Sequence, residues 1–127
     1  MKIEADIKYF KAKHFALRIF RLCKYLKREK GEYEIAKQIF RSGTSIGANI
    51  AEAQYAESNS DFVHKLRVAI KECNETHYWL ELLYESGTIN EKMFQSLELD
   101  CRELTKLLTS IINKKKEDLK SMWATLK

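Results

Sequence analysis

The stretch Gly-Thr-Ser-Ile-Gly, residues 43–47, is the part of the sequence closest to a phosphate-binding motif, because it places Gly43 and Gly47 four residues apart. A P-loop needs a preceding strand, a glycine-rich turn and a Gly-Lys-Ser/Thr ending, and the sequence offers none of the three. Small residues four positions apart also let two helix axes approach closely, although each interior Gly costs a helix about 1 kcal/mol relative to Ala. The spacing therefore favours close helix packing, within the chain or between chains, over phosphate binding.

Residue types suited to catalysis or metal binding are present but do not form a recognisable set. Glu52, Glu72 and Glu75 could lie close together in the folded chain. A pair of carboxylates can perform general acid–base catalysis, but charged residues on helices are usually solvated. Neither His64 nor His77 belongs to a zinc-ligand pattern, and no serine has the strand–turn–helix context of a nucleophile elbow. We expect no catalytic residue, no metal site and no cofactor, and hence a protein that is not an enzyme.

The most distinctive polar pattern is a cationic stripe near the N-terminus. Residues 1–30 contain ten Lys or Arg against three acids, whereas residues 57–89 contain three against six. On a helical wheel the basic residues share one arc with His14 and Tyr25, an arrangement that can neutralise phosphates and stack on an exposed base. A solvated basic face explains the same pattern. The candidate phosphate contacts are Lys11, Arg18, Arg21, Lys24 and Arg28.

The elements that must position these residues are helices. The sequence has no Pro and only four Gly, and its apolar residues recur with helical period, while no stretch shows the period of two that a half-buried strand requires. Four helices are predicted, over about residues 7–29, 32–55, 59–85 and from about 90 to 113 or beyond. Four amphipathic helices joined by short turns favour an all-α, antiparallel up-down-up-down four-helix bundle.

Local signals separate these helices. Gly is typical just after a helix C-terminus, and Ser, Asp or Asn at the start of a helix can accept hydrogen bonds from its free N–H groups. The predicted signals are Gly31 and Gly87 as stops, Ser58 with Asp61 as a capping pair, and Thr88 or Asn90 as the start of the last helix.

The predicted core follows from the apolar face of each helix. From the four helices in turn, the expected core residues are Ala12, Phe15, Ala16, Ile19, Leu22, Cys23 and Leu26; Ala36, Ile39, Phe40, Gly43, Ile46, Gly47 and Ile50; Phe62, Leu66, Ala69, Ile70, Cys73, Leu80 and Tyr84; and Met93, Phe94, Leu97, Cys101, Leu104, Leu108, Ile111 and Ile112.

The chain is expected to form one domain over residues 1–127, with residues 114–127 either extending the last helix, packing on a partner or fraying. Cys23, Cys73 and Cys101 are odd in number and lie among apolar positions, which indicates buried free thiols in a reducing compartment. The first residues lack the apolar run of a secretory signal or a membrane span. We therefore expect a cytoplasmic protein that does not contact a membrane.

Three segments resemble the signature of a known family: Ser-Ile-Gly-Ala-Asn-Ile-Ala-Glu-Ala at residues 45–53, Ser-x-x-Asp-Phe at 58–62, and KLRVAIKECNETHYWLELL at 65–83. These segments are similar to the small four-helix-bundle proteins named for the intervening sequences of bacterial 23S ribosomal RNA genes, and the resemblance extends over about residues 8–112. The matching positions are Ser45, Ile46, Asn49, Ile50, Ala51, Glu52, Ser58, Asp61, Phe62, Leu66, Ala69 and Glu75.

The resemblance implies an up-down bundle that assembles into a homopentameric ring. It also implies a relationship to the accessory protein of diversity-generating retroelements, a basic pentamer that binds a reverse transcriptase and nucleic acid. The implied partners are further copies of the chain, RNA or DNA, and a reverse transcriptase.

We therefore expect a non-enzymatic oligomeric bundle that acts as a nucleic-acid-binding or scaffold module. The alternative is a protein–protein interaction adaptor that binds no nucleic acid. Polar residues of the second helix, on the arc opposite its glycines, could hydrogen-bond a neighbouring helix or subunit. The residues of this predicted packing and oligomer motif are Gly43, Ser45, Gly47, Asn49 and Glu52.

Overall fold

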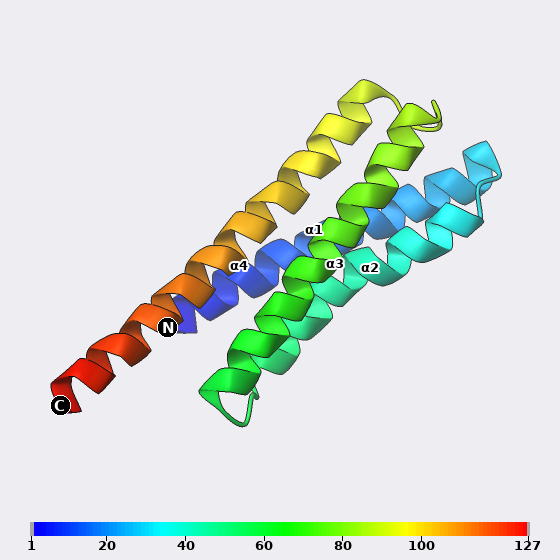
Figure 1. Ribbon diagram of the computed structural model, residues 1–127. Coiled ribbons are helices and arrows are strands. Elements are labelled where there is room, and N and C mark those ends of the chain that lie inside the picture. The colour runs from blue at the N-terminus through cyan, green and yellow to red at the C-terminus, as the bar shows by residue number, and fades with distance from the viewer. Residues whose placement is uncertain (1, 127) are drawn as a thin grey trace.

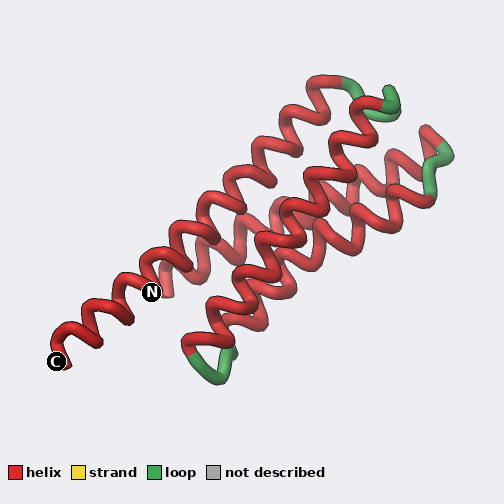
Figure 2. The backbone as a smooth tube through the Cα atoms, viewed as in Figure 1, coloured by secondary structure: helices red, strands yellow, loops and turns green. Residues whose placement is uncertain are grey.

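The computed structural model describes the backbone of residues 2–126 and the side chains of residues 8–126. Four α-helices follow one another in this range and no strand occurs among these residues. They are α1 (Lys2–Lys30), α2 (Glu34–Ala53), α3 (Asn59–Glu85) and α4 (Glu91–Leu126). Short turns join consecutive helices (Figures 1 and 2), which is consistent with an antiparallel up-down-up-down bundle. The expected all-α class is confirmed.

The predicted stop and start signals lie where the helices end and begin. Gly31 and Gly87 have φ angles of +61° and +77°, which residues with a Cβ rarely adopt. Oγ of Ser58 accepts a hydrogen bond from the Asp61 backbone N–H at 3.0 Å, which starts α3 at the residue expected. Oδ1 of Asn90 accepts from the Met93 N–H at 2.8 Å, so Asn90 provides the cap of α4.

Helix α2 is shorter at both ends than the predicted range of 32–55. The Glu32 N–H donates to the Leu26 carbonyl at 2.9 Å and so belongs to the turn that closes α1. At the other end, the N–H groups of Gln54 and Tyr55 donate to carbonyls only three residues back, at 3.3 and 3.0 Å. A tighter last turn of this kind is common where an α-helix ends.

The core lies where the apolar faces of the four helices meet. Helix α1 packs against α2 and α4, and α3 packs against the same two helices. Most of the predicted core residues are buried, including Phe15, Ile46 and Leu80. Burial of these side chains provides the main stabilisation of the bundle.

The prediction was wrong for two residues assigned to the core. Phe40 is 41% exposed, because it lies at the outer edge of the contact between α2 and α1 and packs against Phe20. Tyr84 is 36% exposed and stacks on Phe94 near the turn between α3 and α4, with ring centroids 4.8 Å apart. Both rings lie at the rim of the core because aromatic side chains can bury one face and leave the other in water.

The three cysteines are buried free thiols, as expected. Sγ of Cys23 donates to the Ala36 carbonyl at 3.3 Å, and Sγ of Cys101 donates to the Cys73 carbonyl at 3.2 Å. Burial raises the pKa of the Cys23 thiol to about 11, and the nearby Lys27 charge opposes this only in part. These thiols therefore act as small core residues that link neighbouring helices.

Residues 114–126 continue α4 as a helix, the first of the three alternatives considered for the tail. The end of α4 projects past the N-terminal end of α1 (Figure 1). Ile112 is the last buried residue of α4 in the described chain, and beyond it Met122, Trp123 and Leu126 are exposed. The apolar stripe of α4 thus extends farther than the helices that cover it.

Candidate functional surfaces

The five predicted phosphate contacts all belong to α1, but they are not equivalent. Lys11, Arg21, Lys24 and Arg28 are exposed. Three further cations of α1 are exposed on the same helix: Lys13, Lys27 and Lys30. None of these seven forms an ion pair with a carboxylate of the described residues. We call these seven residues the basic face of α1.

The side chain of Arg18, the fifth predicted phosphate contact, is bound to residues of α4. Its Nη1 forms an ion pair with Oδ2 of Asp100 at 2.5 Å and also donates to the Ser96 carbonyl at 3.3 Å. Nη2 donates to Oγ of Ser96 at 2.6 Å. The side chain is only 26% exposed. Arg18 therefore joins α1 to α4, in addition to contributing charge.

Removing the Arg18 guanidinium should destabilise the bundle. Arg18→Gln and Asp100→Asn are each expected to lower the free energy of unfolding by about 1 kcal/mol, because a partly buried charge-assisted pair is lost. Since the two residues contact each other, the double variant should lose less than the sum of the single variants. Urea unfolding followed by circular dichroism measures the free energy of unfolding of all three variants. Strictly additive losses would contradict a stabilising interaction between Arg18 and Asp100.

The edge of the basic face nearest α4 meets acidic residues. Lys11 and His14 line a shallow depression between α1 and α4 together with Asp100 and Glu103 of α4. The positive potential of α1 is therefore reduced on this side. The other six cations of the basic face do not line this depression.

The two motif glycines lie where α2 packs on α1, within one chain. A Cβ on Gly43 would lie 2.9 Å from Cγ1 and 3.0 Å from Cγ2 of the buried Ile19. A Cβ on Gly47 would lie 3.5 Å from Cβ of Ala12, an ordinary contact distance. Gly43 is therefore required by close packing of α2 on α1, whereas Gly47 leaves room for a methyl group.

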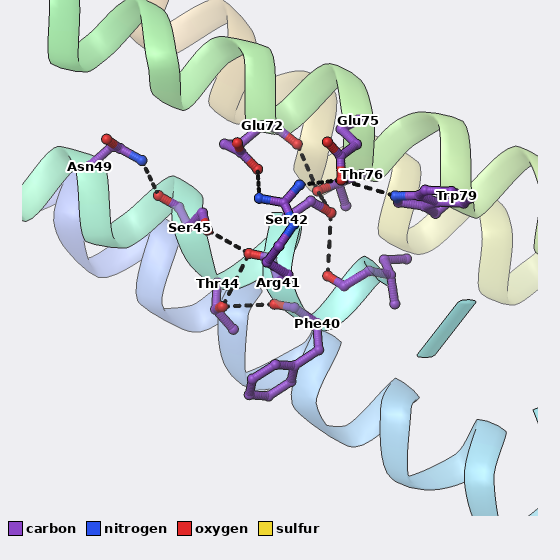
Figure 3. Close-up of polar contacts among 11 residues, drawn as sticks. Phe40, Arg41, Ser42, Thr44, Ser45, Asn49, Glu72, Glu75, Thr76 and Trp79 are labelled. Carbon is purple, nitrogen blue, oxygen red and sulfur yellow. Dashed lines mark hydrogen bonds and ion pairs between the residues drawn. The ribbon is translucent and has the colours of Figure 1, made fainter. Parts of the chain in front are cut away.

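Arg41 and Ser42 of α2 contact α3, and Figure 3 shows the polar side chains around Arg41. Nη1 of Arg41 lies 3.4 Å from Oε2 of Glu72, and its Nη2 forms an ion pair with Oε2 of Glu75. Nε1 of Trp79 also donates to Oε2 of Glu75, at 3.2 Å. Arg41 thus bridges two carboxylates of α3 from the neighbouring helix.

Within this cluster, Glu75 is unsuited to act as a general acid. Burial disfavours the charged form of Glu75, but the hydrogen bonds from Trp79 and Arg41 outweigh it and lower the pKa of Glu75. A carboxylate held ionised by a guanidinium is a poor proton donor at neutral pH. Glu52, the third carboxylate considered, lies apart from the cluster and contacts Lys65 of α3 at 3.9 Å.

Ser45 and Asn49, two polar residues of the motif, form hydrogen bonds along their own helix. Oγ of Ser45 donates to the Arg41 carbonyl at 2.6 Å, and Nδ2 of Asn49 donates to the Ser45 carbonyl at 2.8 Å (Figure 3). Both side chains are half-buried. The oligomeric role predicted for Ser45, Asn49 and Glu52 stays a prediction, since the structure holds one chain.

A buried hydroxyl pair between α2 and α3 was not foreseen from the sequence. Oγ1 of Thr76 donates to Oγ of Ser42 at 2.8 Å, and both residues are fully buried. Oγ of Ser42 also reaches the Ile39 carbonyl at 3.4 Å. The available signal was their position, because each lies on the apolar face of its helix, where a polar residue needs a partner.

In the range that the structure describes, no three His, Cys, Asp or Glu side chains gather into a group that could hold a metal ion. His77 instead lies beside Glu81 on the same helix, with Nε2 and Oε1 3.3 Å apart. Among residues 2–126, no helix combines the length and the apolarity needed to cross a bilayer.

Comparison with known proteins identifies a family and a solved structure that this chain resembles. The profile of the 23S rRNA-intervening sequence protein family matches residues 6–110. A crystal structure of a protein of unknown function from the S23 ribosomal protein family of Bacteroides thetaiotaomicron is 48% identical in sequence, with a TM-score of 0.85, and the match covers 87% of this chain and 98% of that chain. No curated protein matches significantly. Neither match names a catalytic activity. With the profile spanning most of the four-helix bundle, the chain belongs to the 23S rRNA-intervening sequence protein family.

Proposed function

We propose that this protein is a non-enzymatic, homo-oligomeric bundle of the cytoplasm that binds nucleic acid, RNA in the first place, through the basic face of α1. The observation that carries the proposal is the set of seven exposed cations between Lys11 and Lys30, none of which is paired with a carboxylate of the described residues. Cations spread over several turns of one helix match the repeated charge of a phosphate backbone. Three free buried thiols support a reducing compartment.

Assembly into a ring strengthens the proposal. The resemblance noted from the sequence implies a homopentamer, and repeating the basic face in each subunit would sum the positive potentials. For a chain of 15.0 kDa, a pentamer has a mass of about 75 kDa. The same resemblance makes a reverse transcriptase the protein partner to test by pull-down.

The test of the proposal is RNA binding as a function of salt. On a single strand, the logarithm of the affinity should fall with the logarithm of salt concentration with a slope of about −0.7 per neutralised phosphate. Contacts by Lys11, Arg21, Lys24 and Arg28 then predict a slope of about −3. Fluorescence anisotropy with a labelled RNA measures the slope, and light scattering on the same sample gives the mass.

The proposal has clear opposing outcomes. Absence of RNA binding at low salt, or an affinity that does not change with salt, would contradict phosphate recognition by α1. A mass equal to that of one chain would contradict the oligomer, whatever the RNA result.

A protein-interaction adaptor is the second candidate, and the end of α4 favours it. Met122, Trp123 and Leu126 are 56%, 69% and 73% exposed, and large exposed apolar side chains that lie close together are typical of protein contacts. This function predicts a specific protein partner in a pull-down and no retention of RNA.

A further inference from the structure

Three phenylalanine side chains are exposed beside the basic face of α1. Phe10 is 66% exposed and Phe20 is 44% exposed on α1, while Phe40 of α2 is 41% exposed. These residues play no part in the ion pairs or caps that hold the bundle together. Exposed aromatic rings among unpaired cations form a surface that differs from an ordinary solvated helix.

The rings of Phe20 and Phe40 form a pair across the contact between α1 and α2. Their centroids are 5.9 Å apart and their planes are inclined by 55°. Rings inclined in this way do not cover each other face to face. Part of each ring therefore remains open to a planar group from solvent.

Positive charge accompanies these rings. Nζ of Lys24 lies over the face of the Phe20 ring, 4.8 Å from its centroid, and Nζ of Lys13 lies over the Tyr9 ring, 5.8 Å from its centroid. Both lysines are exposed and flexible. When the ammonium moves off the ring to contact a phosphate, the ring face that it covered can stack on the base of the same nucleotide. The arrangement occurs twice along α1.

Resting on the proposed function, we infer that the nucleic acid bound by α1 is single-stranded, with Phe20 and Phe40 stacking on unpaired bases while Arg21 and Lys24 contact the adjacent phosphates. Bases in a duplex are stacked on one another and face inwards, so rings on the convex surface of a bundle cannot reach their flat sides. Unpaired bases of a single strand can turn outwards and stack on such rings without sequence preference.

Phe10 is a second exposed ring of α1, at the depression that Lys11 and His14 share with Asp100 and Glu103 of α4. It lies ten residues before Phe20, which corresponds to about 15 Å along the helix axis. Phe10 and the Phe20–Phe40 pair are therefore too far apart to contact one base. They would contact different nucleotides of the same strand, which favours an extended ligand over a mononucleotide.

The experiment compares two RNA ligands and two double variants. The ligands are a labelled oligouridylate and a labelled RNA duplex, each about twenty nucleotides long, and affinities are measured by fluorescence anisotropy. The test variant, Phe20→Leu with Phe40→Leu, keeps apolar side chains at the rim of the core but removes the rings. The control variant, Tyr55→Leu with Tyr78→Leu, removes two exposed aromatic rings outside α1. Circular dichroism checks that both variants fold.

We expect the wild-type protein to bind the single strand at least tenfold more tightly than the duplex. The test variant should lose about tenfold or more in affinity for the single strand, with an unchanged salt slope, because the phosphate contacts remain. The control variant should bind like the wild type.

The outcomes separate this inference from the proposed function. Equal binding of both ligands, or single-strand binding that the test variant leaves unchanged, would overturn the stacking surface while the binding of RNA by the basic face stands. Absence of binding to either ligand would overturn both. An equal loss in the test and control variants would show a general effect of aromatic residues and would also overturn the assignment to Phe20 and Phe40.

Discussion

Exchanging Lys11, Arg21, Lys24 and Arg28 together for glutamine is expected to reduce the affinity for single-stranded RNA by about a hundredfold or more at 0.1 M salt. Each phosphate contact changes the logarithm of the affinity by about 0.7 for a tenfold change in salt, which is about a fivefold effect between 1 M and 0.1 M. The effects of four such contacts on the affinity multiply to several hundredfold. All four side chains are exposed, so the free energy of unfolding should change little.

A matched control isolates position from total charge. Lys92, Lys106, Lys116 and Lys120 are exposed on α4, and their exchange for glutamine gives a variant with the same net charge. If α1 is the contact surface, this control should keep most of the affinity and nearly all of the salt slope. Equal losses in the two variants would indicate attraction by net charge alone and would contradict a site on α1.

Gly43 and Gly47 should respond in opposite directions to a larger side chain. Gly43→Val is expected to lower the free energy of unfolding by about 2–3 kcal/mol, because its Cβ would meet the buried Ile19 at 2.9 Å. Gly47→Ala is expected to raise it by up to about 1 kcal/mol, since the methyl group finds room and Ala favours the helix. The first change removes a large share of the roughly 5–15 kcal/mol that stabilises a typical domain.

Urea unfolding at one fixed protein concentration measures both effects, because the stability of the proposed oligomer would depend on concentration. A third variant tests the cause. In the Gly43→Val background, Ile19→Ala should cost less than it does in the wild type, since it removes the atoms that the new side chain meets. Equal costs of Ile19→Ala in the two backgrounds would contradict a clash between these two residues.

Local sequence signals predicted the helices well where the signal is itself local. A Gly that must adopt positive φ, as at Gly31 and Gly87, and a hydroxyl that caps the next turn, as at Ser58, act within a few residues. The range of α3 was therefore predicted to the residue. At α2 the prediction was too long at both ends, because the Glu32 N–H bonds to α1 and the last turn tightens.

The surfaces were predicted less completely than the helices. Helical period predicted an arc of basic residues on α1, but it could not show that Arg18 is held by Asp100, a residue 82 positions away in the sequence. The period also assigned Phe40 to the core, whereas the structure places its ring at the rim beside Phe20. A helical wheel gives the direction of a side chain but does not show how far the neighbouring helix covers it.

The sequence by itself determined the all-α class, the order of the helices and the turns, because hydrophobic period and capping depend on residues close together in the chain. The family was indicated separately, by the resemblance of three sequence segments to its signature. Only the tertiary structure decided which cations remain unpaired, that Gly43 packs on Ile19 while Gly47 leaves space, and that Arg41 bridges Glu72 and Glu75. Each of these depends on atoms from two different helices. Their distances are set by the packing of the whole bundle, which no single segment of the sequence specifies.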